Sequence, residues 1–473
     1  MSEYKIKNIC CIGAGYVGGP TMAVFAEHCK NLKIVVSDIN KERIKLWNNK
    51  NISNLPIYEP GLGEVILNTR DKNLFFTNNI EDSIRNADMI FISVNTPTKT
   101  KGLGAGKASD LRWVEASARQ IAKYAVGHTI VVEKSTLPVR TAKTIQKILL
   151  NSQNDNPING DMKTFSVLSN PEFLSEGNAI ADLENPERVL IGGEDAKAIE
   201  ALAQMYLNWV PHDKIIRTNI WSSELSKLTA NAFLAQRISS INAISAICEL
   251  TEADINQVSK SIGLDSRIGD KFLNPGPGFG GSCFQKDILN LVYLCEHYNL
   301  DEVAKYWEQV LTINNWQKDR ISKLIVNSLF GTVSNKKLAI LGFAFKANTN
   351  DTRNSASIKI CKDLIEEGAI LSIYDPKVNE LQMEKDLGIN QVDLTEDKVI
   401  WTKYESLEEV IQDTHAIIIL TEWSEFKKIK WEKFYKKMAR PAWIFDTRSI
   451  IDVKLTKKIG FNVWQIGNFT KSN

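Results

Sequence analysis

The feature that most constrains this chain is a glycine-rich turn near its N-terminus, Gly13-Ala14-Gly15-Tyr16-Val17-Gly18. It has the form G-x-G-x-x-G and follows an apolar run, residues 9–12, that is typical of a buried strand. A helix over residues 20–29 and a strand over residues 33–37 complete a predicted βαβ unit. In that setting the first glycine permits the tight turn, the second lets a pyrophosphate approach the backbone, and the third lets helix and strand pack closely.

An aspartate stands where a dinucleotide site needs one. Asp38 ends the second predicted strand, 20 residues after Gly18. Its carboxylate would accept hydrogen bonds from the ribose hydroxyls and repel a 2′-phosphate, so the sequence favours NAD over NADP. The alternative is a glycine turn without a ligand and a solvated aspartate. The coincidence of strand, turn, helix and acidic residue favours the cofactor site.

Charge and length limit the classes of partner. The 473 residues suggest about three domains at roughly 150 residues each. Lysine and arginine number 58 against 56 aspartates and glutamates, a net charge of +2. These totals indicate neither a nucleic-acid footprint nor a polybasic membrane tether, so we expect small-molecule partners, no nucleic acid and no membrane.

The cysteines and the N-terminus indicate a reducing compartment. The seven cysteines are odd in number, scattered and never spaced as CxxC, so we expect no disulfide framework and no metal site. The first residues lack the basic-then-apolar layout of a signal peptide, and no apolar run reaches about 18 residues. The predicted location is the cytoplasm.

Alternating apolar runs and helical patterns predict an α/β fold. Apolar runs at residues 87–94, 129–132, 165–168 and 189–191 imply a continuing parallel sheet that ends near residue 220. Residues 223–250 repeat apolar side chains every three or four positions and predict one long helix that joins domains or subunits; a buried core helix is the alternative. After Gly331 the alternation resumes with strands at 337–341 and 369–374 around a helix at 355–367 that Gly368 caps. Apolar runs at 416–420 and 442–445 predict two further strands. We therefore predict two Rossmann-like parallel-sheet domains joined by a long central helix, with domains at 1–220, 221–330 and 331–473.

A second glycine-rich segment carries a candidate nucleophile. It runs Asn274-Pro275-Gly276-Pro277-Gly278-Phe279-Gly280-Gly281-Ser282-Cys283-Phe284-Gln285-Lys286-Asp287. Ser282 and Gln285 have capping-box spacing, so Ser282 is predicted to cap a helix whose first residue is Cys283. A thiol at a helix N-terminus ionises more readily, and Asp287 lies four residues on, on the same face. A buried, inert cysteine is the alternative.

Other polar residues indicate a catalytic or ligand-binding site less specifically. Lys227 and Asn231 are spaced i, i+4 on the long helix and could converge on one oxygen, although such residues are most often simply solvated. Loops at 94–98, 133–138 and 169–177 each follow a predicted strand, where open α/β sheets bind ligands. Ordinary turn chemistry would explain each loop taken singly.

A series of motifs spans nearly the whole chain and carries a resemblance to a known family. The motifs are Gly13 to Pro20, Tyr58-Glu59-Pro60-Gly61-Leu62, Phe91 to Thr98, Glu133-Lys134-Ser135-Thr136, Asn170-Pro171-Glu172-Phe173-Leu174, Ser223 to Leu228, Gly278 to Asp287 and Gly342-Phe343-Ala344-Phe345-Lys346. On these residues the chain resembles the eukaryotic UDP-glucose 6-dehydrogenases. The Gly-Gly-Ser-Cys-Phe-Gln-Lys-Asp stretch is the most specific part of the resemblance.

The resemblance implies a four-electron oxidation of UDP-glucose at C6 to UDP-glucuronate, with two NAD reduced and no metal. It assigns Cys283 as the nucleophile that holds the sugar as a thiohemiacetal and then a thioester. Lys227 and Asn231 would steady the oxyanion, Asp287 and Thr136 would position water, and Glu172 would act as acid or base or hold Lys227. The nearest alternative is another nucleotide-sugar 6-dehydrogenase, of the GDP-mannose or UDP-N-acetylmannosamine type, and a non-catalytic NAD-binding scaffold is a third.

The resemblance also supplies expected contacts. It predicts an NAD-binding domain, a central dimerisation domain and a UDP-sugar-binding domain, in dimers that assemble into hexamers. Expected cofactor contacts are Gly13, Gly15, Tyr16, Val17, Gly18, Asp38, Arg43, Val94, Asn95, Thr96, Pro97, Thr98, Ser135, Thr136, Glu176 and Arg353. Expected substrate contacts are Glu172, Phe173, Leu174, Lys227, Asn231, Arg267, Phe272, Phe279, Gly280, Phe345, Lys346 and Arg448, the last toward a neighbouring subunit. Two stretches depart from the animal pattern, Asn274 to Pro277 and Asp446 to Ser449.

Overall fold

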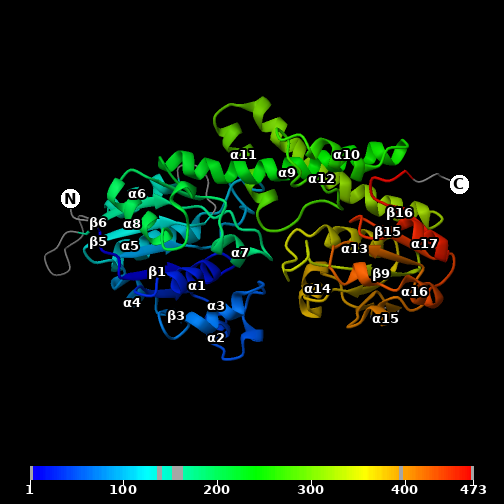
Figure 1. Ribbon diagram of the computed structural model, residues 1–473, viewed down its shortest axis with the longest axis horizontal. Helices are drawn as coiled ribbons and strands as arrows, with labels where there is room; N and C mark the ends of the chain where they lie inside the picture. The colour runs from blue at the N-terminus through cyan, green and yellow to red at the C-terminus, as the bar shows by residue number, and fades with distance from the viewer. Residues whose placement is uncertain (1–3, 136–140, 152–162, 394–397, 470–473) are drawn as a thin grey trace. The chain divides into compact units, whose positions relative to one another are not determined.

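The computed structural model describes residues 4–135, 141–151, 163–393 and 398–469 (Figure 1). The chain groups into two compact units, Met1–Ala230 with Leu289–Asn299, and Asn231–Ile288 with Leu300–Asn473. The division into three domains made from the sequence stays a prediction.

The first unit is built on an eight-stranded sheet in the order β3-β2-β1-β4-β5-β6-β7-β8. Its first six strands have the 3-2-1-4-5-6 order of a dinucleotide-binding sheet. The strands predicted from apolar runs are present, whereas the short β3 and β8 were not predicted. The bounds are β1 (Asn8–Ile12), β2 (Lys33–Ser37), β3 (Leu74–Thr77), β4 (Met89–Ile92), β5 (His128–Glu133), β6 (Thr164–Ser169), β7 (Val189–Gly193) and β8 (Ile215–Thr218).

One pair in this sheet is antiparallel. Leu168 of β6 pairs with Gly193 of β7 in antiparallel register, and every other paired strand in the sheet is parallel to its neighbour. The expectation of a continuing parallel sheet is therefore wrong at β7. The helix between the two strands, Ala179–Glu184, is only about 9 Å long at 1.5 Å per residue, too short to carry the chain back along a strand of about 20 Å.

Helices cover both faces of this sheet. Alternate residues of β1 enter different cores: Ile9 and Cys11 pack with α1, α3 and α8, while Cys10 and Ile12 pack with α4, α5 and α6. This alternation is the two-residue period of a strand buried on both faces. The helices are α1 (Gly18–His28), α2 (Lys41–Trp47), α3 (Leu62–Thr69), α4 (Ile80–Arg85), α5 (Arg112–Tyr124), α6 (Thr141–Asn151), α7 (Ala179–Glu184) and α8 (Ala196–Tyr206).

The predicted long helix is α9 (Ile220–Leu250), about 46 Å at 1.5 Å per residue. It begins three residues before the predicted start because the Asn219 side chain accepts the Ser222 amide at 2.8 Å and caps an extra turn. Residues 220–230 group with the first unit and residues 231–250 with the second. Three further helices follow: α10 (Ile255–Gly263), α11 (Phe284–His297) and α12 (Asp301–Ser328).

The second unit contains a six-stranded sheet in the order β13-β10-β9-β14-β15-β16, with all pairs parallel. Its centre is one apolar core that includes Ile340, Ile373, Ile418 and Phe445. Strands β13 and β16 were not predicted. The bounds are β9 (Lys337–Leu341), α13 (Ala356–Glu366), β10 (Ile370–Tyr374), α14 (Glu380–Leu387), β13 (Trp401–Lys403), α15 (Leu407–Val410), β14 (Ala416–Ile419), α16 (Trp431–Lys437), β15 (Trp443–Asp446), α17 (Val453–Ile459) and β16 (Asn462–Gln465), with a small antiparallel pair of β11 (Val392–Asp393) and β12 (Lys398–Val399).

Helix α13 ends as its sequence predicts. Gly368 has φ +83°, its amide donates to Ile365 at 2.8 Å, and the Ala369 amide donates to Leu364 at 2.9 Å. These two bonds form a Schellman motif, in which a residue without a Cβ adopts the left-handed conformation. The α/β fold with two parallel-type sheets and a long central helix is confirmed. Among the described helices, none combines the length and apolar character needed to cross a bilayer.

Candidate active site

The glycine turn after β1 has the three properties that a dinucleotide turn requires. Gly13 has φ +110°, and a Cβ there would stand 2.2 Å from the carbonyl oxygen of Ser93, at the end of β4. A Cβ on Gly18 would stand 2.0 Å from the Gly13 carbonyl oxygen. A Cβ on Gly15 would meet nothing within 4 Å. Gly13 and Gly18 therefore serve close packing, while Gly15 leaves an open cradle where a pyrophosphate can approach the backbone.

Asp38 is bound to this turn. Its Oδ2 accepts the Ala14 amide at 2.9 Å and the Arg43 guanidinium at 3.2 Å, and its Oδ1 accepts the Asn40 amide at 2.8 Å. The residue is 7% exposed. The structure thus brings Arg43, Asp38 and the glycine turn together, an arrangement that fits the ribose and pyrophosphate of NAD.

The loops after β4 and β5 are joined to each other beside this turn. Ser135 donates its hydroxyl to the Val94 carbonyl at 2.7 Å and its amide to Ile92 at 3.2 Å. Thr96 is buried, Asn95 and Pro97 are exposed, and Val94 and Thr98 are half-buried. Thr136 lies outside the described residues. Tyr16, Val17 and Glu176 are half-buried.

A buried ion pair follows β6. Glu172 Oε1 lies 3.1 Å from Lys227 Nζ, and both side chains are about 95% buried. Burial opposes ionisation of Glu172, but Lys227 and the Leu174 amide, which donates to Oε2 at 2.7 Å, outweigh it and lower the pKa of the carboxyl. Phe173 packs between cations, with its ring 3.9 Å from the Arg188 guanidinium and 5.5 Å from Lys227 Nζ. Glu172, Phe173, Leu174 and Lys227 therefore meet as predicted from the motifs.

Two residues of this unit escaped the sequence analysis although both lie in quoted motifs. Lys134 is 3% exposed, donates to Asn170 Oδ1 at 3.0 Å, and burial lowers its pKa to about 8. Glu59 accepts the amides of Gly177 and Ala179 at 2.8 and 3.1 Å and so holds the loop after β6 at the start of α7. In the sequence, Lys134 could be recognised as a charged residue beside the end of a strand, and Glu59 as a charged residue before a Pro-Gly turn. Neither pattern predicts the direction in which the side chain points.

In the second unit, Cys283 differs from the other cysteines. All seven lie in described residues; six are buried and Cys283 is half-buried. Burial raises the pKa of Cys10 to about 12 and of Cys29 to about 11, so these thiols stay protonated. Cys283 Sγ lies 3.5 Å from the Ser282 hydroxyl oxygen. By accessibility it is the cysteine suited to react.

Cys283 immediately precedes α11 instead of opening it, so the predicted helix start is wrong by one residue. The Gly281 amide donates to Arg353 at 2.7 Å and Gly281 has φ +81°, which keeps the chain non-helical up to this point. The Cys283 carbonyl accepts the Asp287 amide at 2.9 Å, as an N-cap residue's carbonyl does. The sulfur still lies at the positive end of the helix.

Asp287 is buried at the first turn of α11, where it contacts Asn231, a predicted site residue, and Lys286, for which no role was predicted. Asn231 donates its amide to Asp287 Oδ2 at 2.6 Å, and Lys286 Nζ lies 3.7 Å from Oδ1. Asp287 is 1% exposed and Asn231 6%. Asn231 therefore fixes the orientation of the Asp287 carboxylate, which lies four residues after Cys283 in the sequence. Asn231 itself lies one helical turn after Lys227 on α9.

Three buried amides that the sequence analysis missed hold residues 274–281, which we call the glycine-rich loop. Asn314 accepts the Phe279 amide at 2.7 Å and donates to the Phe279 carbonyl at 3.2 Å. Asn242 accepts the Gly276 amide at 2.8 Å, and Gln317 donates to the Gly276 carbonyl at 2.9 Å. Each amide residue is at most 2% exposed. In the sequence, these three amides could have been recognised as polar residues on the inward face of an amphipathic helix.

The far end of the glycine-rich loop packs on predicted substrate residues. A Cβ on Gly280 would stand 2.9 Å from Phe345 Cβ, and one on Gly276 would stand 3.2 Å from Arg448 Nη1. Arg448 also donates to the Phe345 carbonyl at 3.2 Å, and Lys346 Nζ lies 5.5 Å from the Phe345 ring. Phe279, Gly280, Phe345, Lys346, Arg353 and Arg448 thus gather around one loop.

Two other predicted substrate residues, Arg267 and Phe272, are exposed. The Arg267 side chain is 87% exposed and forms a 2.6 Å ion pair with Asp265. Phe272 is 39% exposed and has φ +62°. Their predicted roles, and the reach of Arg448 to a neighbouring subunit, stay predictions.

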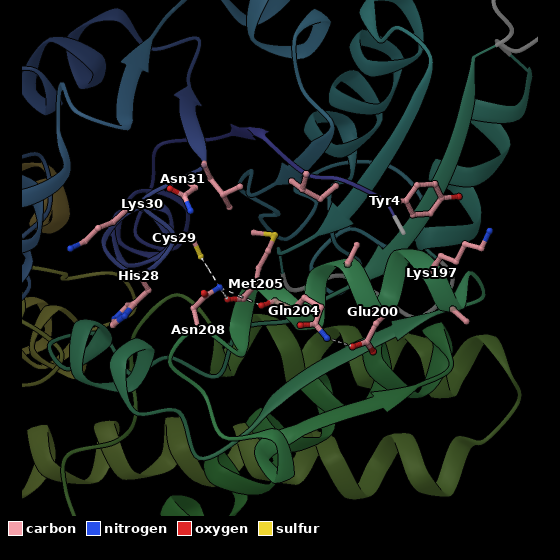
Figure 2. Close-up of a pocket in the computed structure, with 14 residues that line it drawn as sticks. Tyr4, His28, Cys29, Lys30, Asn31, Lys197, Glu200, Gln204, Met205 and Asn208 are labelled. Carbon is pink, nitrogen blue, oxygen red and sulfur yellow. Dashed lines mark hydrogen bonds between the residues drawn. The ribbon is translucent and has the colours of Figure 1, made fainter. Parts of the chain in front are cut away.

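A cavity of about 480 Å³ lies in the first unit, away from its glycine turn (Figure 2). It is lined by Tyr4, Cys29, Asn31 and Gln204, among others, where the chain enters β1 and β2. These are the amino ends of the strands, opposite the edge that carries the glycine turn. In the described residues, no cluster of three or more His, Cys, Asp or Glu side chains is placed to hold a metal ion.

The sheet order, the glycine turn and the cysteine beside a helix start define an α/β enzyme of the nucleotide-dependent dehydrogenase class. The chain matches the UDP-glucose/GDP-mannose dehydrogenase family over three domains: the NAD binding domain at residues 7–210, the central domain at 221–316 and the UDP binding domain at 339–453. It belongs to that family and is an NAD-dependent oxidoreductase.

Several known dehydrogenases are similar to this chain over nearly its full length. UDP-glucose 6-dehydrogenase 4 of Arabidopsis thaliana is 54% identical, with 97% of this chain and 96% of that protein covered. UDP-glucose 6-dehydrogenase of Bos taurus is 53% identical, with 99% and 94% covered. Among solved structures, a UDP-glucose dehydrogenase from the archaeon Pyrobaculum islandicum superposes with a TM-score of 0.81 at 28% identity and 99% coverage of both chains.

Two glycines of the turn, Gly15 and Gly18, should respond differently to alanine. Gly15→Ala has open space and an ordinary φ, so it should keep the thermal stability of the parent while weakening NAD binding at least tenfold by blocking the pyrophosphate approach. Gly18→Ala should lower the melting temperature, because its Cβ would overlap the Gly13 carbonyl. Calorimetric titration with NAD and thermal melts test both. Equal NAD affinity in Gly15→Ala would contradict the cradle.

Lys227→Met should leave an uncompensated buried carboxylate and cost about 3–5 kcal/mol of unfolding free energy at pH 7. Without Lys227, burial dominates and the pKa of Glu172 rises above its unfolded value, so the deficit should shrink as the pH falls toward about 4. Urea denaturation at pH 7 and pH 5 measures this, and adding Glu172→Gln should restore much of the loss. A deficit independent of pH would show that the ion pair is not its cause.

Proposed function

We propose that this chain oxidises the C6 alcohol of UDP-glucose to a carboxylate, giving UDP-glucuronate with two NAD consumed. The observation that carries the proposal is the half-buried Cys283, set between the glycine-rich loop and the start of α11, in a chain that is 53–54% identical to plant and animal UDP-glucose 6-dehydrogenases over nearly its whole length. A nucleophile in this position is what a four-electron oxidation needs to retain the aldehyde.

The cofactor is held by the first unit. Gly15 leaves the approach for the pyrophosphate, Asp38 binds the ribose hydroxyls, and the loops at Val94 and Ser135 line the crevice beside the turn. Bound NAD supplies the hydride acceptor for both oxidations. Because Asp38 is tied to the Ala14 amide, it is positioned to disfavour a 2′-phosphate.

Cys283 carries the sugar between the two oxidations. The sulfur adds to the aldehyde carbon and gives a thiohemiacetal, which on oxidation becomes a thioester; attack of water then releases the carboxylate and restores the thiol. Asp287, held in place by Asn231, is the group that orients this water. The covalent link prevents loss of the reactive aldehyde.

Lys227 and Asn231 supply charge and a hydrogen bond to the oxygen that becomes negative. A preorganised donor in a buried site is typically worth about 3–4 kcal/mol in the transition state. The ion pair with Glu172 keeps Lys227 charged and in one place, and Glu172 can return a proton through it. Thr136 completes the proposal as a water-positioning residue.

The same chemistry on another sugar is the second candidate. A dehydrogenase acting on a GDP-mannose or UDP-N-acetylmannosamine type substrate would use the same cysteine, and only the pocket would differ. The identity of 53–54% to UDP-glucose 6-dehydrogenases favours UDP-glucose as the substrate.

We further propose that the protein is located in the cytoplasm, because a reducing compartment suits seven free cysteines. We also propose that it forms dimers that assemble into a hexamer.

Cys283→Ser should reduce steady-state NADH production by at least 10³-fold while UDP-glucose still binds, because a hydroxyl forms no comparable adduct at neutral pH. An NADH absorbance assay and a binding titration measure the two effects. Cys295→Ser, at a buried cysteine on α11, is the control and should stay active. Turnover near that of the parent in Cys283→Ser would remove the covalent mechanism.

The stoichiometry should be two NADH for each uronate formed. A spectrophotometric assay across UDP-glucose, GDP-mannose and UDP-N-acetylmannosamine, with the product quantified by chromatography, gives both the ratio and the substrate. A ratio of one would indicate a simple alcohol dehydrogenase. Faster turnover of either other sugar would transfer the assignment to the second candidate.

A further inference from the structure

Glu133 is a buried glutamate that none of the proposed steps uses. It is the last residue of β5, two residues before Ser135, and is 2% exposed. Neither of its side-chain oxygens accepts a hydrogen bond from the part of the chain that the structure describes. A buried carboxylate without a hydrogen-bond donor or a cation would strongly destabilise the fold, so the group is unsuited to carry a charge there.

The neighbour of Glu133 is a second buried carboxyl, that of Glu224 near the start of α9. Ser169 pairs with Glu133 across β5 and β6, and its hydroxyl oxygen lies 3.0 Å from that of Ser223. Glu224 follows Ser223 and is 3% exposed, and the side chains of the two glutamates are hydrogen-bonded. Carboxylate oxygens are acceptors only, so two carboxyl groups form such a bond only when one of them carries a proton.

Among the described residues, no other charged group faces Glu133 from the elements that pack against it. On the same face of the sheet its neighbour in β4 is Ile92, and the buried face of α6 contributes Ile145. The adjacent Lys134 instead donates its ammonium to Asn170, at 3.0 Å. With no cation to compensate a charge, a proton is what allows this carboxyl to be buried.

Glu224 is the member of the pair that suits the negative charge. Its Oε1 accepts the amide of Ala142, the second residue of α6, at 2.9 Å, and the start of a helix stabilises an anion. Burial and the neighbouring Glu224 together raise the pKa of Glu133 well above its ordinary value. At neutral pH the proton therefore belongs on Glu133, which donates it to Glu224.

The pair connects three elements of the candidate active site. Glu133 leads into the loop in which the Ser135 hydroxyl binds the Val94 carbonyl, and Glu224 lies one helical turn before Lys227 while it binds the start of α6. We propose that Glu133 and Glu224 hold one proton between them and, as a hydrogen-bonded pair, position the starts of α9 and α6 against the cofactor loop. Any effect on turnover rests on the proposed function, whereas the shared proton and its effect on NAD binding do not.

The shared proton makes stability depend on pH. An unfolded glutamate has a pKa of about 4.3, so above that pH the folded chain keeps a proton that the unfolded chain releases. From this source the folding equilibrium constant should fall about tenfold for each pH unit until the pKa of the folded pair is passed. Glu133→Gln donates an amide hydrogen to Glu224 at every pH, so it should lack this slope. Urea denaturation of both proteins at pH 5.5 and 7 isolates the difference.

Glu133→Leu separates positioning from the filling of space. Leucine suits a buried site but leaves Glu224 without its donor from β5, so this variant should bind NAD about tenfold more weakly and melt at a lower temperature. Glu133→Gln should stay close to the parent in both. If the side chain only filled space, leucine would match glutamine. Glu64→Gln, at an exposed glutamate of the same unit, is the control and should change neither quantity.

The test combines the denaturation series with infrared spectroscopy and calorimetric NAD titration of the full chain. A protonated-carboxyl band that is present in the parent and absent in Glu133→Gln, together with the steeper pH dependence of the parent, supports the shared proton. Equal slopes, or equal bands, overturn it. Equal NAD affinity in Glu133→Leu and Glu133→Gln overturns the positioning, and Glu133→Asp, whose shorter side chain does not reach Glu224, gives the same comparison if the leucine variant does not fold. Failure of the parent to oxidise UDP-glucose would overturn the proposed function and would leave these readouts unchanged.

Discussion

The structure depends on a close approach of backbone to backbone at the first turn of each sheet. Gly13 leaves β1 with φ +110° beneath the end of β4, where a Cβ would overlap Ser93. Gly342 leaves β9 with φ +93°, and a Cβ there would stand 2.3 Å from Thr421, at the end of β14. Any side chain at either glycine would push the first strand away from its neighbour. Since the ligand-binding edges begin at these turns, the rest of each site follows from this one constraint.

The two turns share an aspartate but differ in what they leave for a ligand. Asp38 accepts one amide of the first turn and Gly15 stays open. Asp375 accepts the amides of Phe343 and Ala344 at 2.7 and 3.0 Å, and the Trp423 indole donates to the same oxygen at 3.2 Å. The second turn is therefore satisfied by the protein itself. One topology thus leaves an open turn at Gly15 in one unit and a turn closed by the protein's own groups in the other.

Buried polar groups hold the candidate site residues in place in both units. The charges of Glu172 and Lys227 compensate each other, and Asp287 accepts a hydrogen bond from Asn231. The glycine-rich loop forms no helix or strand, and amides on α9 and α12 replace the hydrogen bonds of a regular element. Such groups cost free energy on burial, and their concentration around the cysteine and the strand ends is typical of functional sites.

Much of the fold was predictable because the signals are local. Long apolar runs placed the central strands, and Ser355 and Gly368 placed the ends of α13 to within one residue. The short β3, β8, β13 and β16 were missed since they mix buried residues with partly buried or exposed ones and are recognised only by pairing with a neighbour. The antiparallel direction of β7 was missed for the same reason: an apolar strand pairs in either direction, and the short α7 decides which.

The sequence by itself determined the positions of the glycine turn, Asp38, Cys283 and the long helix, because glycine conformation, residue spacing and helical periodicity act over a few residues. Tertiary structure alone decided that Glu59 holds the loop after β6 and that Asn314 and Gln317 hold the glycine-rich loop. The partner of a buried polar group comes from a segment distant along the chain. Only the packing of helices and sheets brings the two together, and no local pattern records it.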